Sequence, residues 1–143
     1  DQVGRSIEAG AELRLGGMVP VTEGAYYPIT LLKDVKPGMA AFDEEIFGPV
    51  FSVIQAKDEE DAIELGNQTP FGLGAAVFTQ DLKKGEEIAK SGLYAGACFV
   101  NDFVKSDPRL PFGGIKESGY GRELSSYGLM EFVNIKTVVV KNR

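Results

Sequence analysis

A run of closely spaced glycines between Leu110 and Leu124 is the sequence feature that most constrains the fold. Four glycines fall within nine residues, at Gly113, Gly114, Gly119 and Gly121. Such a cluster indicates that the backbone adopts positive φ angles or approaches another segment closely. The Arg-Glu-Leu that follows is typical of the opening of a helix. We therefore predict a tightly shaped loop at this position instead of a simple connector.

Length and charge limit the possible classes of function. With 143 residues, 43% of them hydrophobic, the chain is long enough for one ordinary core. A net charge of −6 argues against nucleic acid or an anionic membrane as a partner. The apolar runs are too short to cross a bilayer.

Cysteine and histidine usage narrows the chemistry further. The single cysteine excludes an internal disulfide, and the start of the chain lacks a signal-peptide pattern, so we expect a cytoplasmic protein. Histidine is absent, which excludes His-dependent triads within this chain and leaves too few soft ligands for zinc. No metal site is expected.

Helical and strand patterns alternate along the chain. Helices are predicted at residues 2–13, 58–66, 82–91 and 123–133, and strands at residues 26–35, 49–56, 74–79, 96–101 and 136–141. The central part therefore has the order β-α-β-α-β with short connections. This order predicts an α/β fold with a parallel sheet and right-handed crossovers.

Three consecutive acids, residues 43–45, stand between two phenylalanines. Runs of acids more often form a solvated turn than a site. Here Phe42 and Phe47 flank the acids, and Gly48-Pro49 imposes a turn directly afterwards. A carboxylate beside an aromatic ring can accept hydrogen bonds from sugar hydroxyls while the ring packs against a planar heterocycle. The residues alone leave both interpretations open.

Cys98 is the one thiol of the chain and lies inside an apolar strand pattern. It has no cationic neighbour in sequence, and no histidine is present to activate it. A buried cysteine that acts as a small hydrophobe is therefore the favoured interpretation. A thiol enzyme that uses Cys98 would require this side chain to be exposed and reactive.

The loop from Asn101 to Phe112 leads from a strand end into the glycine cluster. Loops at the carboxyl ends of parallel strands often bind ligands. Ser106 and Arg109 offer a hydroxyl and a fork of donors, which suit a substrate carboxylate. On these residues alone, a surface loop kept soluble by its charges is the favoured interpretation.

The predicted C-terminal strand is apolar on both faces. Val138, Val139 and Val140 follow one another instead of alternating with polar residues. Such a strand is either threaded into a sheet of its own domain or paired with another chain. The periodicity leaves both possibilities open.

Two motifs together carry a resemblance to a known family. The segment Glu44-Glu-Ile-Phe-Gly-Pro-Val50 and the glycine loop resemble the C-terminal part of the aldehyde dehydrogenase superfamily, and the likeness covers essentially the whole chain. It implies that Glu45 hydrogen-bonds the nicotinamide ribose of NAD or NADP and that Phe47 packs beside the nicotinamide. It also places the catalytic cysteine and the general base upstream of this chain, and Cys98 at a structural strand position.

The substrate loop resembles the succinate-semialdehyde dehydrogenase branch through Lys105-Ser-Asp-Pro-Arg-Leu-Pro-Phe-Gly-Gly114. This likeness implies that Ser106 helps to hold the distal carboxylate of the substrate. It also implies that Phe112 lines the aldehyde channel. Arg109 is a further candidate for substrate binding.

The resemblance implies a C-terminal part of a catalytic domain at residues 1–134 and an oligomerisation strand at residues 135–143, and hence a homo-oligomer. The implied reaction is attack of a cysteine on an aldehyde, hydride transfer to NAD(P) and hydrolysis of the thioester. This chain carries no catalytic residue of that reaction and is expected to be inactive alone. The alternative is a non-enzymatic α/β binding or assembly module that kept the interface of the family.

Overall fold

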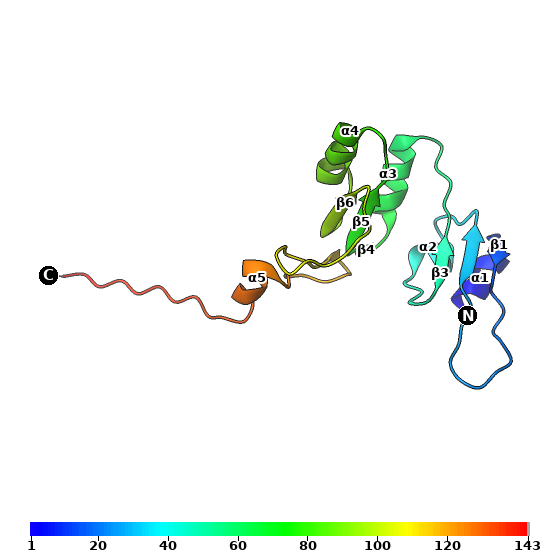
Figure 1. Cartoon of the computed structure of the whole chain (residues 1–143), viewed down its shortest axis with the longest axis horizontal. Helices are drawn as coiled ribbons and strands as arrows, with labels where there is room; N and C mark the ends of the chain where they lie inside the picture. Colours follow the sequence, from blue (N-terminus) through cyan, green and yellow to red (C-terminus); the bar gives the residue numbers. More distant parts are fainter. Residues whose placement is uncertain (143) are drawn as a thin grey trace. The chain divides into compact units, whose positions relative to one another are not determined.

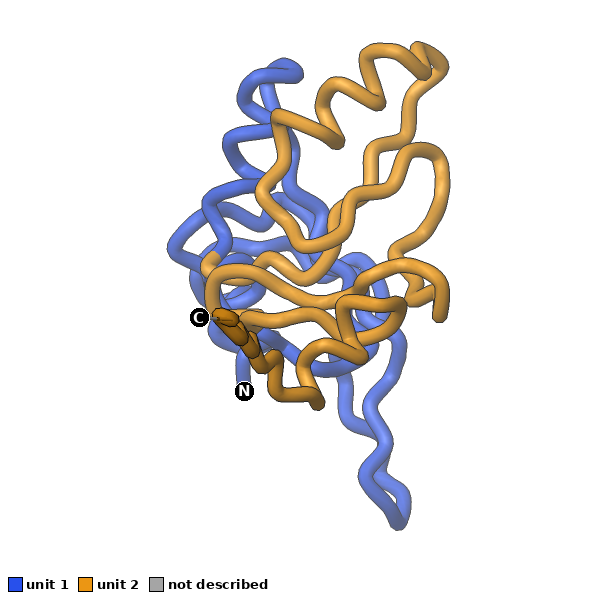
Figure 2. Tube along the Cα trace, turned by 90° about the vertical axis from the view of Figure 1, so that its left-hand side faces the viewer, with its two compact units in different colours: residues 1–69 blue, residues 70–143 orange. Residues whose placement is uncertain are grey.

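The computed structural model describes residues 1–142 of the chain. They divide into two compact units, one from Asp1 to Thr69 and one that begins at Pro70 (Figure 2). Residue 143, the last of the predicted strand domain, lies outside the described residues. No helix within residues 1–142 is long and apolar enough to cross a membrane.

The first unit combines three helices with a small mixed sheet (Figure 1). Its elements are α1 (Gln2–Glu8), β1 (Glu12–Leu15), β2 (Thr30–Lys33), α2 (Ala40–Asp43), β3 (Val50–Ser52) and α3 (Glu59–Gln68). Strand β2 lies in the centre of the sheet, antiparallel to β1 and parallel to β3. The sheet therefore brings the segments on either side of α2 together.

Helix α1 is shorter than predicted. The predicted helix at 2–13 ends at Glu8, because Gly10 adopts a φ of +109° that a helix cannot continue through. The residues after it form β1, which pairs Glu12 with Lys33. Likewise, only Thr30–Lys33 of the predicted strand 26–35 is a strand.

The core of the first unit lies between α1, α2 and β2. Its buried hydrophobic residues are Val3, Ala11, Leu32, Val35, Met39, Ala40 and Ala41. The fully buried Ser6 joins the two helices, because its hydroxyl donates to the Gln2 carbonyl (2.8 Å) and accepts from the Ala41 N–H (2.9 Å). Helix α2 is therefore fixed on α1 by packing and by hydrogen bonds.

The second unit contains short strands and a single crossover. Its elements are β4 (Phe71–Gly72), β5 (Gly74–Val77), α4 (Leu82–Glu87), the π-helix η1 (Ile88–Gly92), β6 (Ala97–Val100), β7 (Ile115–Lys116) and α5 (Ser125–Met130). Strands β5 and β6 pair in parallel from Gly74↔Ala97 to Val77↔Val100. The helical segment α4–η1 connects them, which confirms the predicted β-α-β order of residues 74–101.

Two helices begin close to their predicted first residues, and each has an aspartate as its N-cap. The Asp58 carboxylate accepts the Asp61 N–H at the start of α3 (2.9 Å), and the Asp81 carboxylate accepts the Lys84 N–H at the start of α4 (3.1 Å). These side chains satisfy backbone donors that the first turn leaves without partners. The predicted starts of both helices are confirmed.

The mixed α/β content is confirmed, but the prediction of one parallel sheet was wrong for this chain. The strands form three small sheets, with the orders β1-β2-β3, β4-β7 and β5-β6. Strands β1 and β7 run antiparallel to their neighbours. Sequence patterns missed β7 because it has only two residues and lies inside the glycine-rich loop.

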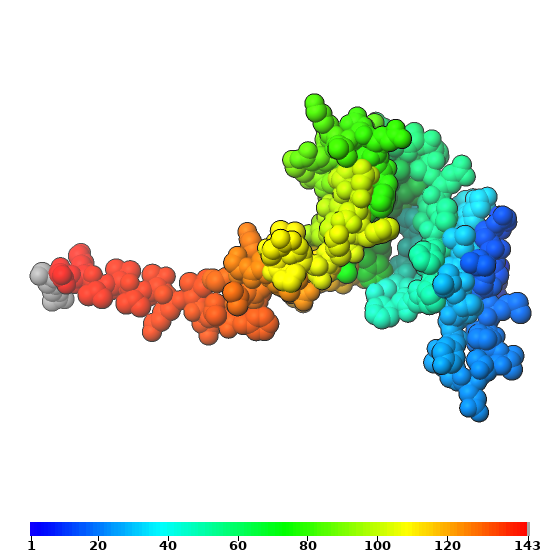
Figure 3. Space-filling view, viewed as in Figure 1, coloured from blue at the N-terminus to red at the C-terminus, as the bar shows by residue number. Residues whose placement is uncertain are grey.

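The C-terminal segment from residue 134 to residue 142 forms no helix and no strand within this chain. Its apolar side chains are exposed, among them Ile135, Val138, Val139 and Val140. Figure 3 shows this C-terminal segment, coloured orange to red, as an extended stretch of chain. The strand predicted at 136–141 is therefore not formed inside the chain, and its pairing with another subunit stays a prediction.

Candidate functional site

The candidate cofactor residues lie on the segment that connects α2 to β3. The Asp43 carboxylate accepts the Gly38 N–H (3.0 Å), which closes the turn before α2. Both Glu45 and Phe47 are exposed, and Phe47 is 92% exposed. The backbone of Phe47 adopts a φ of +48°, a conformation that is uncommon for a bulky residue. Strained backbone conformations of this kind are common at functional sites, so the φ of Phe47 agrees with a functional role for this segment.

Glu44, the neighbour of Glu45, is engaged with helix α1. The Arg5 guanidinium donates two hydrogen bonds to the Glu44 carboxylate (2.7 and 2.8 Å), and Gln2 Nε2 donates a third (3.0 Å). The hydrogen bonds from Arg5, followed by that from Gln2, lower the pKa of Glu44 to about 2. Glu44 is therefore a structural carboxylate although it is partly open to solvent, and Glu45 is its exposed neighbour.

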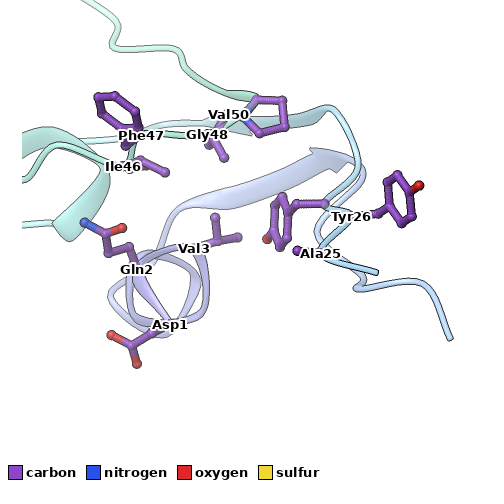
Figure 4. A pocket seen from close by; sticks show the side chains of 11 residues that line it. Asp1, Gln2, Val3, Ala25, Tyr26, Ile46, Phe47, Gly48 and Val50 are labelled. Atoms are coloured by element: carbon purple, nitrogen blue, oxygen red, sulfur yellow. The ribbon is translucent and has the colours of Figure 1, made fainter. Parts of the chain in front are cut away.

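A pocket of about 520 Å³ lies beside this segment (Figure 4). It is lined by Tyr26, Tyr27, the residues from Ile46 to Val50 and the start of α1. The Phe47 ring points away from α1, whereas the Gln2 side chain points from α1 toward the Ile46 segment. Glu45 is not one of the residues that line this pocket. An exposed carboxylate two residues from an exposed aromatic ring suits a ribose and a planar ring, and these roles of Glu45 and Phe47 stay predictions.

The glycine loop of the second unit folds tightly on itself. Phe112 and Glu123 exchange backbone hydrogen bonds of 2.9 and 2.8 Å across it, and Arg122 Nη1 donates to the Gly114 carbonyl (2.9 Å). Gly119 and Gly121 have φ angles of +119° and +85°. The predicted tight loop is confirmed, and its glycines serve both positive φ angles and close backbone contacts.

The glycine loop lies against Gly96, where the lack of a side chain allows Gly113 to approach closely. A Cβ atom on Gly96 would lie 1.7 Å from the carbonyl oxygen of Gly113, far inside contact distance. Gly96 precedes β6, and its N–H donates to the Gly72 carbonyl (2.9 Å). The glycine loop therefore packs directly against the start of β6.

Phe112 lies at the entrance of this loop and is half-buried. It lines a pocket of about 390 Å³, together with Leu73, Phe132 and the glycine loop itself. The walls combine these apolar groups with the polar side chains of Ser118, Tyr120, Arg122, Glu123 and Glu131. Phe112 thus lines a pocket, and its role in an aldehyde channel stays a prediction.

Ser106 and Arg109 lie on the irregular segment between β6 and the glycine loop. Ser106 is exposed. The fork of Arg109 is occupied by Asp107, through contacts of 2.9 Å from Nε and 2.6 Å from Nη2. These hydrogen bonds lower the pKa of Asp107 and raise that of Arg109. The sequence did not indicate this ion pair. A substrate carboxylate would have to replace the Asp107 carboxylate in order to bind Arg109.

Cys98 lies in β6 opposite Ala75 and is half-buried. Burial raises the pKa of the Cys98 thiol, so the reactive thiolate is disfavoured. A nucleophilic cysteine needs the opposite shift. This environment agrees with the prediction that Cys98 is structural.

The candidate residues fall into one set in each unit. Glu45 and Phe47 share the segment after α2 in the first unit, and Ser106, Arg109 and Phe112 share one stretch of the second. Sequence reasoning missed the contacts of Gln2 and Arg5. Their partners lie 39 to 43 residues away, and no local pattern announces such a pairing.

Comparison with known proteins identifies the family. The profile of the aldehyde dehydrogenase family matches residues 1–138. A probable succinate-semialdehyde dehydrogenase [NADP(+)] from Synechocystis sp. is 49% identical over 137 residues, which are 96% of this chain and 30% of that protein. The succinate semialdehyde dehydrogenase [NAD(P)+] Sad from Escherichia coli K12 is also 49% identical, over 96% of this chain and 29% of that protein.

A solved structure agrees with these relatives. The succinic semialdehyde dehydrogenase from Streptococcus pyogenes, in complex with NADP+, superimposes with a TM-score of 0.92 at 37% identity, covering 99% of this chain and 31% of that chain. The chain thus spans about 30% of the length of the curated relatives it matches. On this evidence, the chain belongs to the aldehyde dehydrogenase family.

Proposed function

We propose that this chain is the C-terminal part of an NAD(P)-dependent aldehyde dehydrogenase that oxidises succinate semialdehyde to the carboxylate. The observation that carries the proposal is the 49% identity to succinate-semialdehyde dehydrogenases over 137 residues. In this proposal, residues 1–134 belong to the catalytic domain and residues 135–143 are an oligomerisation strand. The exposed valines at Val138, Val139 and Val140 support pairing with a second copy.

The first unit would contribute to the cofactor site. Glu45 would accept hydrogen bonds from the nicotinamide ribose, and Phe47 would pack beside the nicotinamide. The fit is supported by an exposed carboxylate next to an exposed ring, while the adjacent Glu44 is held by Arg5. When bound, NAD(P) supplies the acceptor for the hydride of the aldehyde. The part of this chain is to bind and orient.

The second unit would contribute to the substrate site. The Ser106 hydroxyl would donate to the distal carboxylate of succinate semialdehyde, and Phe112 would line the channel for its carbon chain. Arg109 would add a charge-assisted hydrogen bond after leaving Asp107. The exposure of Ser106 and the pocket that Phe112 lines support these roles.

The chain by itself would be catalytically silent. The nucleophilic cysteine and the general base would be supplied by the remainder of the enzyme. The raised pKa of Cys98 supports this division, because that thiol is not activated. Without the nucleophile and base, the transition-state contacts cannot form.

The first test compares reduction of NAD and NADP by the purified chain and by the longer enzyme to which we assign it. With succinate semialdehyde, we expect turnover by the longer enzyme and none by the chain. A Cys98→Ala variant of the longer enzyme should remain active. Turnover by the isolated chain that disappears in Cys98→Ala would instead show that Cys98 is a nucleophile and that the proposal is wrong.

A second arm of the test addresses the substrate. Removing a hydrogen bond to a charged group costs about 1.5–3 kcal/mol, so Ser106→Ala should raise the KM for succinate semialdehyde about tenfold or more. The KM for butanal, which lacks the carboxylate, should not change. Ser91→Ala, an exposed serine of the same unit, is the matched control. An equal effect on both aldehydes would contradict the assignment of Ser106.

A further inference from the structure

Helix α1 reaches the segment that carries Glu45 through two side chains. Gln2 Nε2 donates to two acceptors at once, the Glu44 carboxylate (3.0 Å) and the backbone carbonyl of Glu45 (3.0 Å). Figure 4 shows this side chain pointing from α1 toward the segment. Gln2 therefore fixes the backbone of Glu45 itself, while the Glu45 carboxylate stays exposed to solvent.

Arg5, one turn further along α1, completes the connection. Its Nη1 and Nη2 form a two-pronged contact with Glu44 at 2.7 and 2.8 Å, and its Nε donates to Asp1 (2.8 Å). A guanidinium fork on a carboxylate restricts orientation as well as distance. Glu44 is thus held by three donors from one helix.

Hydrogen bonds also hold the base of this connection. Ser6, which follows Arg5 and is buried in α1, donates its hydroxyl to the Gln2 carbonyl and accepts the Ala41 N–H of α2. By contrast, the segment from Glu44 to Pro49 is neither helix nor strand. Side chains from α1 hold its first residues, Glu44 and Glu45, while the Thr30 N–H donates to the Pro49 carbonyl at its end (2.9 Å).

We propose that Gln2 and Arg5 are positioning residues for the nicotinamide ribose, acting through Glu44 and the backbone of Glu45. This inference rests on the proposed role of Glu45 in cofactor binding. A protein carboxylate that binds a ligand must be held to within about 0.5 Å of its productive position. Gln2 and Arg5 supply that constraint without touching the cofactor.

The test uses the longer enzyme and replaces Gln2 with Met, which keeps the length of the side chain and removes both donors. The net worth of a hydrogen bond is about 0.5–1.5 kcal/mol, so the Kd for NADPH should rise about fivefold. The KM for the aldehyde and the Tm should change little. Gln2→Lys, which keeps a donor, should restore most of the affinity. Glu8→Met on the exposed side of α1 is the matched control.

A double-mutant cycle separates positioning from a general structural role. If Gln2 acts through Glu45, Gln2→Met should have no further effect on the Kd in a Glu45→Gln background. The same weakening in both backgrounds would overturn the proposal, as would an unchanged Kd in Gln2→Met alone. An unchanged Kd in Glu45→Gln alone would overturn the cofactor role of Glu45 as well. That single variant therefore distinguishes failure of the proposed function from failure of the positioning role.

Discussion

The two units of the chain are stabilised by different means. The first has a buried core of apolar side chains, including Leu32 and Val35, together with the buried hydroxyls of Ser6 and Thr30. In the second, the buried residues among those described from residue 70 to residue 142 are all glycines. They are Gly72, Gly85, Gly114 and Gly128. Its large apolar side chains are half-buried or exposed.

This difference shows how each unit holds its candidate residues. In the first, side chains from a packed helix hold the segment that carries Glu45 over a separation of about 40 residues. In the second, close backbone approach shapes the loop, and the charged pair beside Ser106 spans two residues. In the first unit, the stability should therefore be most sensitive to truncation of a core side chain. In the second unit, it should be most sensitive to the addition of a methyl group at a closely packed glycine.

The largest expected effect comes from the core of the first unit. Leu32 is fully buried, so Leu32→Ala should lower the free energy of unfolding by about 3–4 kcal/mol through lost burial and a residual cavity. Hydrogen exchange of the β2 amides would measure it. Leu82→Ala, at a leucine that is 64% exposed in the second unit, should change stability by less than about 0.5 kcal/mol. Equal effects would remove the contrast between the units.

The next effect comes from the backbone contact in the second unit. In Gly96→Ala, the new Cβ would lie 1.7 Å from the Gly113 oxygen, so the glycine loop and the start of β6 must separate. Overpacking of this kind costs about 1–3 kcal/mol, and the loop amides should exchange faster. Gly4→Ala in α1 has no atom within 4 Å of its Cβ and should raise stability by about 0.5–1 kcal/mol. Unchanged exchange in Gly96→Ala would argue against close approach as the function of this glycine.

Sequence patterns predicted those features of the fold that depend on neighbours in the chain. The starts of α3 and α4 agree with the helices predicted at residues 58–66 and 82–91, and Asp58 and Asp81 cap backbone donors three residues away. The parallel pair of β5 and β6 followed from two apolar runs separated by a helix. The pairing of β1 was missed because the helix predicted at 2–13 extends into its first residues, and that of β7 because the strand has only two residues and pairs with a distant segment.

The candidate site shows the same limit. The acid cluster and its phenylalanines directed attention to residues 42–47, but nothing local distinguishes the structural Glu44 from the exposed Glu45. The two residues differ because the chain that leaves α2 directs the Glu44 carboxylate, and not that of Glu45, toward Gln2 and Arg5 of α1. Likewise, Ser106 and Arg109 were predicted as candidates, whereas the occupation of Arg109 by Asp107 was not.

A smaller effect on stability is expected when the pH is lowered. Hydrogen bonds from Arg5 lower the pKa of Glu44 from an ordinary value of 4.5 to about 2. The unfolded chain therefore binds this proton more readily than the folded chain does. The stabilisation is fully present above about pH 4.5 and is lost as the pH falls toward 2. The Tm difference between the natural chain and Glu44→Gln should shrink in that window, whereas that for Glu8→Gln, at an exposed residue of α1, should not follow it. A difference that stays constant from pH 7 to pH 2 would contradict this linkage.

The smallest effect on stability should come from the other arginine pair. Arg109 is 86% exposed and bonds a residue two positions away, whereas Arg5 and Glu44 are about half as exposed and connect segments 39 residues apart. Exposed pairs within one loop contribute little, so Arg109→Ala should leave the Tm unchanged and Arg5→Ala should lower it. Carboxyl titration by NMR should nevertheless show the pKa of Asp107 rising in Arg109→Ala, because the bonds that lower it are gone. A Tm loss in Arg109→Ala equal to that in Arg5→Ala would mean that the second unit also depends on a charged pair. If the Tm stays unchanged, Arg109 can leave Asp107 for a substrate carboxylate without disturbing the fold around it.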